Sequence, residues 1–459
     1  MEIIKKLEKL DKLPMHMPGH KRNIELAPYL KRLAADLDIT EIEGFDDLHC
    51  PEGILQKSQQ TAAQIRNARC AFYSVNGSTC AVLATVCALI CRGDKVICMR
   101  NCHKSVYNAL ELSGANPVFV CSECDERYGF CRSLRTERMT EAIENNRDAK
   151  LVILTSPTYE GAVCDIEAIS KTAHRYNIPV LVDAAHGAHL GYGQEFLPDA
   201  IACGADVSVE SLHKTLPSLT QTAVCYVSGI ADENRIAEML GVFETSSPSY
   251  LLLSSIDGCI NLIKEKKDDI FDYWRRNLDW FYSETTKLKN LKIFRNENNE
   301  FFAFDRSKII ILTSSGTRLI SRLRDMGIEC EMASARYVIA MTGAGDSHEN
   351  FETLADILYS LDGEFEEWSD NICIYPYDNI NVMPAEEALA REKEYVDLSE
   401  AAERISGEYI WAYPPGVPII IPGEKVTCEH VRAMKQYEEC GIELKGRIKR
   451  EKGKILVLK

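Results

Sequence analysis

The chain has 459 residues, 46% of them hydrophobic and 27% charged, which is typical of a globular protein with roughly two to four domains. Its 53 Lys and Arg against 69 Asp and Glu leave a net charge of −16. This acidity argues against nucleic acid as a partner, because binding a phosphate backbone requires clustered cations. An acidic cleft would attract cationic small molecules, although the same charge is equally consistent with a surface that maintains solubility.

No targeting or membrane segment is predicted. The stretch 1–14 is charged and lacks the apolar core of a signal peptide, and no stretch approaches the run of about 18 apolar residues that a membrane helix needs. We therefore expect a cytoplasmic protein that does not bind membranes and whose 18 cysteines are reduced. Cys121 and Cys124 form a C-x-x-C with Cys131 nearby. The further ligand that a zinc site needs is missing, so no metal is predicted.

Between residues 66 and 230, short apolar runs alternate with helical stretches. The predicted strands are 70–75, 95–99, 116–121, 151–156, 179–184, 207–211 and 223–228. The predicted helices are 79–91, 104–113, 137–145 and 165–176. Several strands are continuously apolar, as in a parallel sheet that is covered on both faces. We therefore predict an α/β domain with a mostly parallel central sheet, whose ligand lies beyond the carboxyl ends of the strands.

The second half of the chain predicts a smaller α+β domain. A charged stretch within 259–300 reads as a long helix with Trp274 on its apolar side. Strands at 307–312 and 336–341 and helices at 316–326 and 349–361 follow it. The tail contains a proline-rich apolar stretch, YPPGVPIIIPGE, at 413–424.

The segment 208–223 carries the densest chemical signal. Ser211, His213 and Lys214 lie directly after a predicted strand. A lysine forms a Schiff base when a desolvated pocket or a nearby cation lowers its pKa, and the neighbouring hydroxyl and imidazole would suit a phosphate monoester. Taken alone, however, an incidental loop lysine is the simpler explanation.

Asp183 ends the apolar strand VLVD, upstream of Lys214. A buried carboxylate needs a partner, and a protonated pyridine nitrogen is one that would keep a cofactor ring able to accept electrons. The alternatives are a loop-capping role or a metal site shared with His186 and His189.

A strand, a glycine-containing turn and an apolar helix follow one another at 73–90. Gly77, Ser78 and Thr79 would lie at the start of the helix, where free N–H groups and the dipole favour phosphate, although Ser and Thr are also ordinary helix caps. His103 follows the next strand and is placed to stack on a flat ring. Together with Asp183 and Lys214, these features indicate pyridoxal 5'-phosphate.

The sequence resembles the ornithine/lysine/arginine decarboxylases, which are pyridoxal-phosphate enzymes of the aspartate-aminotransferase fold (fold type I), and in particular their short form, exemplified by biosynthetic arginine decarboxylase. The resemblance rests on MPGHK (17–21), TEIEGFDDLHCPEGIL (40–55), NGSTCA (76–81), HKS (103–105), SPTYEG (156–161), VDAAHGAH (182–189), SLHKTLPSLTQ (211–221), TSSPSYLLLSS (245–255) and WAYPPGVPIIIPGE (411–424). Ala184 stands where the family often has an acidic residue.

The resemblance implies a role for each matched residue. Lys214 would be the catalytic Schiff-base lysine and Asp183 the partner of the pyridine nitrogen. His103 would stack on the ring and take part in catalysis. The remaining cofactor-binding residues would be Ser78, Thr79, Ser211 and His213 around the phosphate, and His186 beside the ring.

The resemblance also implies a homodimer or higher homo-oligomer with shared active sites, in which Ser246 and Ser247 reach the neighbour's cofactor. The expected division of the chain is an N-terminal arm with an active-site loop (1–60), a large cofactor-binding domain (61–265), a small α+β domain (266–370) and a C-terminal α+β decarboxylase domain (371–459).

The expected reaction is decarboxylation of a basic amino acid for polyamine synthesis. Arginine, which would yield agmatine, is favoured over lysine and ornithine. A cationic side chain needs a carboxylate, and Asp46 and Asp47 are candidates, unless these acids cap helices or face solvent. An aminotransferase of the same fold and a non-catalytic regulatory homologue are the alternatives.

Overall fold

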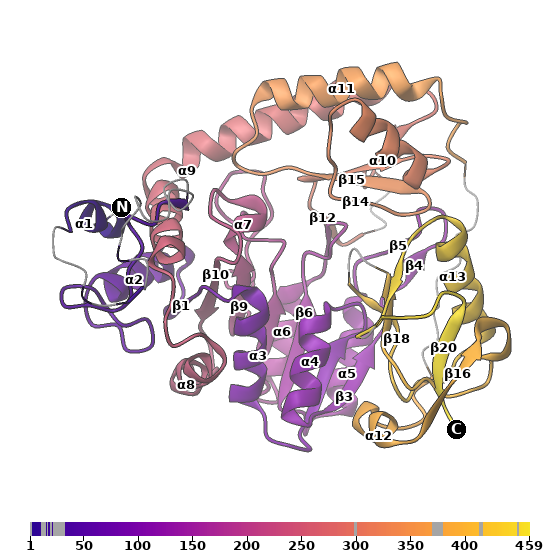
Figure 1. Ribbon diagram of the computed structural model, residues 1–459, viewed down its shortest axis with the longest axis horizontal. Coiled ribbons are helices and arrows are strands. Elements are labelled where there is room, and N and C mark those ends of the chain that lie inside the picture. The colour runs from indigo at the N-terminus through magenta and orange to yellow at the C-terminus, as the bar shows by residue number, and fades with distance from the viewer. Residues whose placement is uncertain are drawn as a thin grey trace.

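The core of the protein is a seven-stranded sheet (Figure 1). The computed structural model describes residues 2–10, 15, 17–18, 21, 33–297, 301–369, 380–412, 416–447 and 449–459. The sheet has the order β1-β10-β9-β8-β6-β2-β3. Its strands are β1 (Cys70–Ser74), β2 (Lys95–Met99), β3 (Asn116–Val120), β6 (Leu151–Thr155), β8 (Val180–Asp183), β9 (Val207–Ser211) and β10 (Ala223–Val227).

Five neighbouring strands, from β9 to β3, run parallel, and β10 and β1 join them as antiparallel strands at one edge. The prediction of a mostly parallel sheet is therefore confirmed. All seven strands end within a residue of the predicted bounds. Apolar runs marked the central strands β6 and β8 most clearly, because both faces of these strands are buried.

Helices cover both faces of this sheet. One apolar cluster joins Val96 and Cys98 of β2 to α3 (Gly77–Leu89), α4 (Lys104–Ser113) and α8 (Glu233–Phe243). The opposite cluster joins Ile97 and Met99 of the same strand to α5 (Thr136–Asn145) and α6 (Ile166–His174). Successive side chains of a strand point to opposite faces, so β2 contributes to both layers and the sheet lies in the middle of a three-layer unit.

The long helix predicted in the second half is α9 (Tyr250–Glu284), and it begins earlier than predicted. Trp274 lies on its buried side, and the indole N–H donates to Oγ1 of Thr342 at 3.0 Å. The four-stranded antiparallel sheet beside it has the order β11-β13-β15-β14. Its elements are β11 (Lys292–Ile293), β13 (Lys308–Leu312), β14 (Met332–Ala333) and β15 (Tyr337–Met341), with α10 (Gly316–Asp325) and α11 (His348–Asp362) packed on it.

Small elements complete the chain. At the N-terminal side, α1 (Glu2–Glu8) and α2 (Ile54–Arg66) contact α9. The strand β7 (Ala162–Val163) pairs with β12 (Ala303–Phe304) and so ties the second half of the chain to the first. The C-terminal part consists of α12 (Ala385–Ala390), β16 (Lys393–Asp397), β17 (Ile410–Ala412), β18 (Pro418–Ile420), α13 (Cys428–Glu439), β19 (Leu444–Lys445) and β20 (Lys454–Leu458).

The C-terminal part rests on the large sheet through a buried ion pair. Arg100, just after β2, contacts Glu424 at 2.9 Å, and both side chains are almost fully buried. Part of the proline-rich stretch, 413–415, lies outside the described residues. The four-part division of the chain stays a prediction.

The expectation that all cysteines are reduced is wrong for one pair. Cys124 and Cys131 form a disulfide between β4 (Cys124–Asp125) and β5 (Phe130–Cys131). These two short strands pair directly, with the two cysteines opposite each other. Cys124 belongs to the C-x-x-C pattern, and Cys131 lies seven residues further along the chain. The pairing of the two strands brings these two cysteines together.

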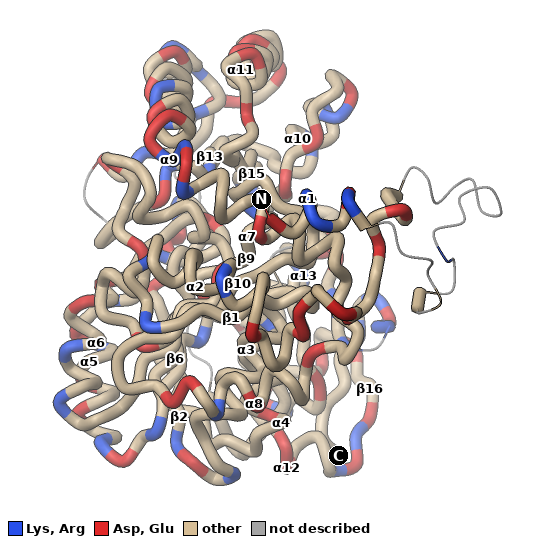
Figure 2. The backbone as a smooth tube through the Cα atoms, turned by 90° about the vertical axis from the view of Figure 1, so that its left-hand side faces the viewer, with Lys and Arg blue, Asp and Glu red and all other residues tan. Residues whose placement is uncertain are grey.

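Each helix of the described part of the chain is too short or too polar to cross a lipid bilayer. Acidic and basic positions are interspersed over the elements visible in Figure 2. This is the pattern of an ordinary charged surface rather than of a face with a single sign.

Candidate active site

The chemically promising residues meet at one edge of the large sheet. Thr155 of β6 lies opposite Asp183 of β8, and Asp183 lies opposite Val209 of β9. These strands are parallel, so their carboxyl ends share one edge. Ser211 ends β9, and Lys214 follows it in the short helix α7 (Leu212–Thr215). The strand order thus brings Asp183 and Lys214 together, as their positions after predicted strands suggested.

Asp183 is a buried carboxylate that accepts a hydrogen bond from the backbone. It is 4% exposed, and one carboxylate oxygen accepts the backbone N–H of Ala185 at 3.2 Å. Burial raises its pKa, and the nearby Lys214 ammonium partly opposes this rise. A carboxylate in this position is stabilised by a cation placed against it.

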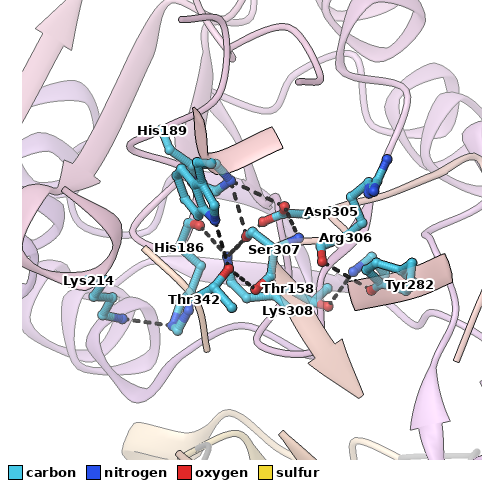
Figure 3. A network of polar contacts seen from close by, with 12 residues as sticks. Thr158, His186, His189, Lys214, Tyr282, Asp305, Arg306, Ser307, Lys308 and Thr342 are labelled. Atoms are coloured by element: carbon cyan, nitrogen blue, oxygen red, sulfur yellow. Dashed lines mark hydrogen bonds and ion pairs between the residues drawn. The ribbon is translucent and has the colours of Figure 1, made fainter. Parts of the chain in front are cut away.

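Lys214 lies against an imidazole. Its Nζ is 2.7 Å from Nε2 of His186 (Figure 3). Burial lowers the pKa of Lys214, the carboxylates of Asp183 and Glu331 oppose this effect, and the cationic Lys308 adds to it. A lysine with a lowered pKa is more often the neutral amine that attacks a carbonyl carbon.

His186 is held neutral, because burial and then the cations Lys214 and Lys308 lower its pKa well below the ordinary value. When Lys214 is protonated it can only donate, so Nε2 accepts and the imidazole proton stands on Nδ1. Among the described residues, Nδ1 is buried and without a hydrogen-bond partner. The ring edge of Tyr159 packs on this imidazole, with 4.9 Å between ring centroids.

The turn before α3 has room for an anion. Gly77 has a φ of +78°, and a Cβ added there would meet nothing within 4 Å. The flanking Asn76 makes no side-chain hydrogen bond to the helix start, so Ser78 and Thr79 lie in the first turn and do not act as its cap. The hydroxyl of Ser211 donates to that of Ser78 at 2.9 Å. Two hydroxyls and the N-terminus of a 13-residue helix therefore converge here.

The two remaining predicted histidines have different roles. His103 caps α4, where its Nδ1 accepts the backbone N–H of Ser105 at 3.2 Å. Burial, followed by the charge of Lys214 and of Lys104, lowers the pKa of His103 to about 4, which places it in the same site. Nδ1 of His213 donates to the carbonyl of Thr222 at 3.1 Å, since a carbonyl oxygen only accepts.

Two family models match the chain in succession. The model described as Orn/Lys/Arg decarboxylase, major domain, matches residues 9–361, and the one described as Orn/Lys/Arg decarboxylase, C-terminal domain, matches residues 376–446. The chain belongs to the Orn/Lys/Arg decarboxylase family. The resemblance found in the sequence motifs is thus confirmed, and so is the interpretation of the protein as a decarboxylase.

Individual relatives agree with this assignment. An arginine decarboxylase of Bacillus subtilis (strain 168) is 30% identical over 460 residues, which cover 96% of this chain and 94% of the relative. The solved structure of lysine decarboxylase A from Pseudomonas aeruginosa has a TM-score of 0.83 at 16% identity, over 100% of this chain and 80% of that one. A ureidoglycine-glyoxylate aminotransferase from Bacillus subtilis has a TM-score of 0.52 at 15% identity, over 68% of this chain and 85% of that one. The predicted fold class is confirmed.

The decarboxylase uses one predicted substrate residue to shape its backbone. Asp46 accepts the backbone N–H groups of four residues, at 2.7–3.4 Å, around the start of α2: Glu52, Gly53, Leu55 and Gln56. Burial alone would raise the pKa of Asp46, but these hydrogen bonds lower it. Asp47 accepts the backbone N–H of His49 at 2.8 Å. The capping alternative thus describes Asp46, and a substrate role for either residue stays a prediction.

Sequence reasoning missed Glu331, which directly precedes β14. The hydroxyl of Tyr159 donates to its carboxylate, and its charge raises the pKa of Lys214. Tyr159 lies in the SPTYEG segment, but Glu331 lies in no quoted motif. In the sequence, Glu331 is simply an acidic residue next to a short apolar stretch, and this pattern does not indicate a functional site.

A metal role for the histidines after β8 is not favoured. Nε2 of His186 faces Lys214, and Nε2 of His189 contacts Asp305 at 3.2 Å. Within the described residues, no three His, Cys, Asp or Glu side chains are arranged to hold a metal ion.

Proposed function

We propose that this protein is a pyridoxal-phosphate-dependent decarboxylase of a basic amino acid, with arginine preferred and agmatine as the product. The observation that carries the proposal is the contact of Lys214 with His186 beside the buried carboxylate of Asp183. Relatives named arginine decarboxylase match nearly the whole chain at 29–30% identity, which supports arginine over lysine or ornithine.

Pyridoxal phosphate suits the residues present. The open turn at Gly77, with the hydroxyls of Ser78 and Ser211, would hold the phosphate. Asp183 would face the pyridine nitrogen, and the unpartnered Nδ1 of His186 would donate to a polar atom at the ring's edge. When bound, this cofactor supplies an electron sink for the pair left on Cα as carbon dioxide departs.

Each side chain has a task that its surroundings support. Lys214 would hold the cofactor through Nζ, and its lowered pKa favours the neutral amine. Asp183 would stabilise a protonated pyridine nitrogen, because a buried carboxylate is itself stabilised by a cation beside it. His186 accepts a hydrogen bond at Nε2 from Nζ of Lys214 and so orients the amine. His103 would stack on the ring, and Thr79 and His213 would complete the phosphate site.

Glu331 is our candidate for the carboxylate that binds the side-chain cation of the substrate. Replacing it by Gln, Glu331→Gln, should raise KM for the preferred amino acid about 10- to 100-fold, because a hydrogen bond to a charged group contributes roughly 1.5–3 kcal/mol. Steady-state kinetics measure this. Glu329→Gln is the matched control, since Glu329 lies on the same segment but pairs with Arg324 and does not contact Tyr159. An unchanged KM in Glu331→Gln, with a raised KM in Asp47→Asn, would instead place the cation at the predicted N-terminal acids.

The reaction itself is tested with purified protein, added pyridoxal phosphate and arginine, lysine or ornithine in separate incubations. We expect carbon dioxide and agmatine from arginine, with slower or absent release of cadaverine and putrescine. Formation of a keto acid in place of an amine would favour the aminotransferase alternative. Cofactor binding without turnover of any of the three would favour a regulatory homologue.

Three finer points belong to the same proposal. The protein would act in the cytoplasm and supply polyamine synthesis with its amine product. It would form a homodimer or larger homo-oligomer in which Ser246 and Ser247 reach the partner's site. Sedimentation of the purified protein measures the oligomeric state.

A further inference from the structure

Lys308, the first residue of β13, is a lysine without exposed surface. Its Nζ donates to the backbone oxygen of His186 at 3.0 Å, to Oδ2 of Asp305 at 2.7 Å and to Oγ of Ser307 at 3.1 Å (Figure 3). All three ammonium protons thus have an acceptor. A buried charge persists only when it is paired and hydrogen-bonded in this way, and one of the acceptors is the backbone of the residue that contacts Lys214.

Asp305 extends the network to two further loops. Its Oδ1 contacts Nε2 of His189 at 3.2 Å, and its backbone N–H donates to the carbonyl of Gly161 at 2.8 Å. Gly161 has a φ of +109°, and a Cβ there would lie 2.9 Å from the backbone oxygen of Asp305. The start of β13 is therefore in close contact with the loop that carries Tyr159 and with the loop that carries His186.

The titratable groups around Lys214 and His186 come from several parts of the fold. They are Asp183 at the end of β8, Tyr159 in the loop after β6, Glu331 before β14, Asp305 and Lys308 at the start of β13, and His103 at the start of α4. Burial lowers the pKa of Lys214 most, and Lys308 is the cation that lowers it further. Burial also lowers the pKa of His186, with Lys308 adding to this and Asp305 opposing it.

We propose that Asp305 and Lys308 form a positioning pair that holds the backbone of His186 so that its imidazole meets Lys214, and that the charge of the pair sets how readily Nζ of Lys214 loses its proton. Both side chains are buried, and their polar contacts are with groups of the protein. They act through His186, by one hydrogen bond to its carbonyl and by their charges. The inference rests on the proposed role of Lys214 as the cofactor-binding lysine.

The titration of Lys214 tests the pair directly. Lysine labelling of the protein freed of pyridoxal phosphate, at a series of pH values and read by mass spectrometry of the peptide that contains Lys214, gives the pH midpoint of its reactivity without any turnover. Lys308→Met removes the cation, so the midpoint should rise by about one pH unit, the scale of a nearby like charge. Asp305→Asn leaves the cation uncompensated, so the midpoint should fall.

These opposite shifts separate positioning from simple destabilisation. Arg100→Met is the matched control, because Arg100 forms a buried ion pair with Glu424 at another contact of the large sheet. It should lower the thermal unfolding temperature and leave the midpoint of Lys214 unchanged. If Lys308→Met does not fold, Asp305→Asn carries the test alone. A midpoint in the folded variants equal to that of the wild type, or a shift in the same direction in both, would overturn the proposal.

The test also distinguishes this inference from the proposed function. If the wild-type protein releases no amine from any basic amino acid but the midpoints shift in opposite directions, the pair tunes Lys214 for a different reaction. If the wild type releases agmatine and the midpoints do not move, the decarboxylase proposal stands and the pair serves only to join β13 to the large sheet.

Discussion

Replacing Lys214 by Ala should abolish decarboxylation, with a loss of kcat on the order of 10⁴-fold or more. The variant lacks the amine that we propose holds the cofactor, so the visible absorbance of lysine-bound pyridoxal phosphate should vanish as well. Amine release and the absorbance spectrum of the purified variant measure the two effects. Lys214 is half-buried in a short helix and belongs to no apolar cluster, and the protein should therefore remain folded.

Lys214→Arg is the informative control for this prediction. Arginine keeps the positive charge beside Asp183, but a guanidinium remains protonated and is a poor nucleophile. Both variants should be inactive if the neutral amine is required. Substantial turnover in Lys214→Arg would mean that the charge alone suffices, which would contradict the assignment of Lys214 as the cofactor-binding residue.

Asp183→Asn should lower kcat on the order of 10²- to 10³-fold, the size of the loss when one preorganised electrostatic partner is removed from an active site. The amide preserves the shape of the side chain and the buried position but not the negative charge. A neutral partner no longer favours a protonated pyridine nitrogen, so the electron sink weakens while Lys214 can still bind the cofactor. Stopped assays of amine release together with the absorbance spectrum measure this.

Asp165→Asn is the control for the loss of charge. Asp165 caps α6 by accepting the backbone N–H of Ala168 at 3.0 Å, and it lies outside the group of residues around Lys214. Asparagine is also a good helix cap, so this variant should keep both stability and activity. If Asp183→Asn were as active as Asp165→Asn, the buried carboxylate would have only a structural role.

The candidate site was partly predictable because its main residues come from local patterns. Asp183 ends the apolar strand VLVD, and Lys214 follows the strand VSVES, whose residues are all buried. Once those strands are parallel neighbours, their ends share an edge. The antiparallel strands β1 and β10 at the sheet's edge were read as part of the same pattern, because an apolar run does not reveal strand direction.

Other residues had no local signal. Lys308 begins an apolar strand and meets the backbone of His186, 122 positions away in the sequence. Asp46 carried the chemistry of a substrate ligand, but its oxygens bind backbone N–H groups around the start of α2. Whether a carboxylate is available to a ligand depends on which donors the fold brings to it, and the amino-acid type does not contain that information.

The amino-acid sequence by itself determined the fold class, the strands and helices around the candidate site, and the family to which the chain belongs. Hydrophobic periodicity and turn chemistry act over short stretches of chain, so they can be read from the sequence. The tertiary structure alone decided that Glu331 lies beside Tyr159 and that Lys308 contacts the backbone of His186. These contacts depend on how the small sheet, the loops and the large sheet pack together, and packing over long distances leaves no periodic trace in the sequence.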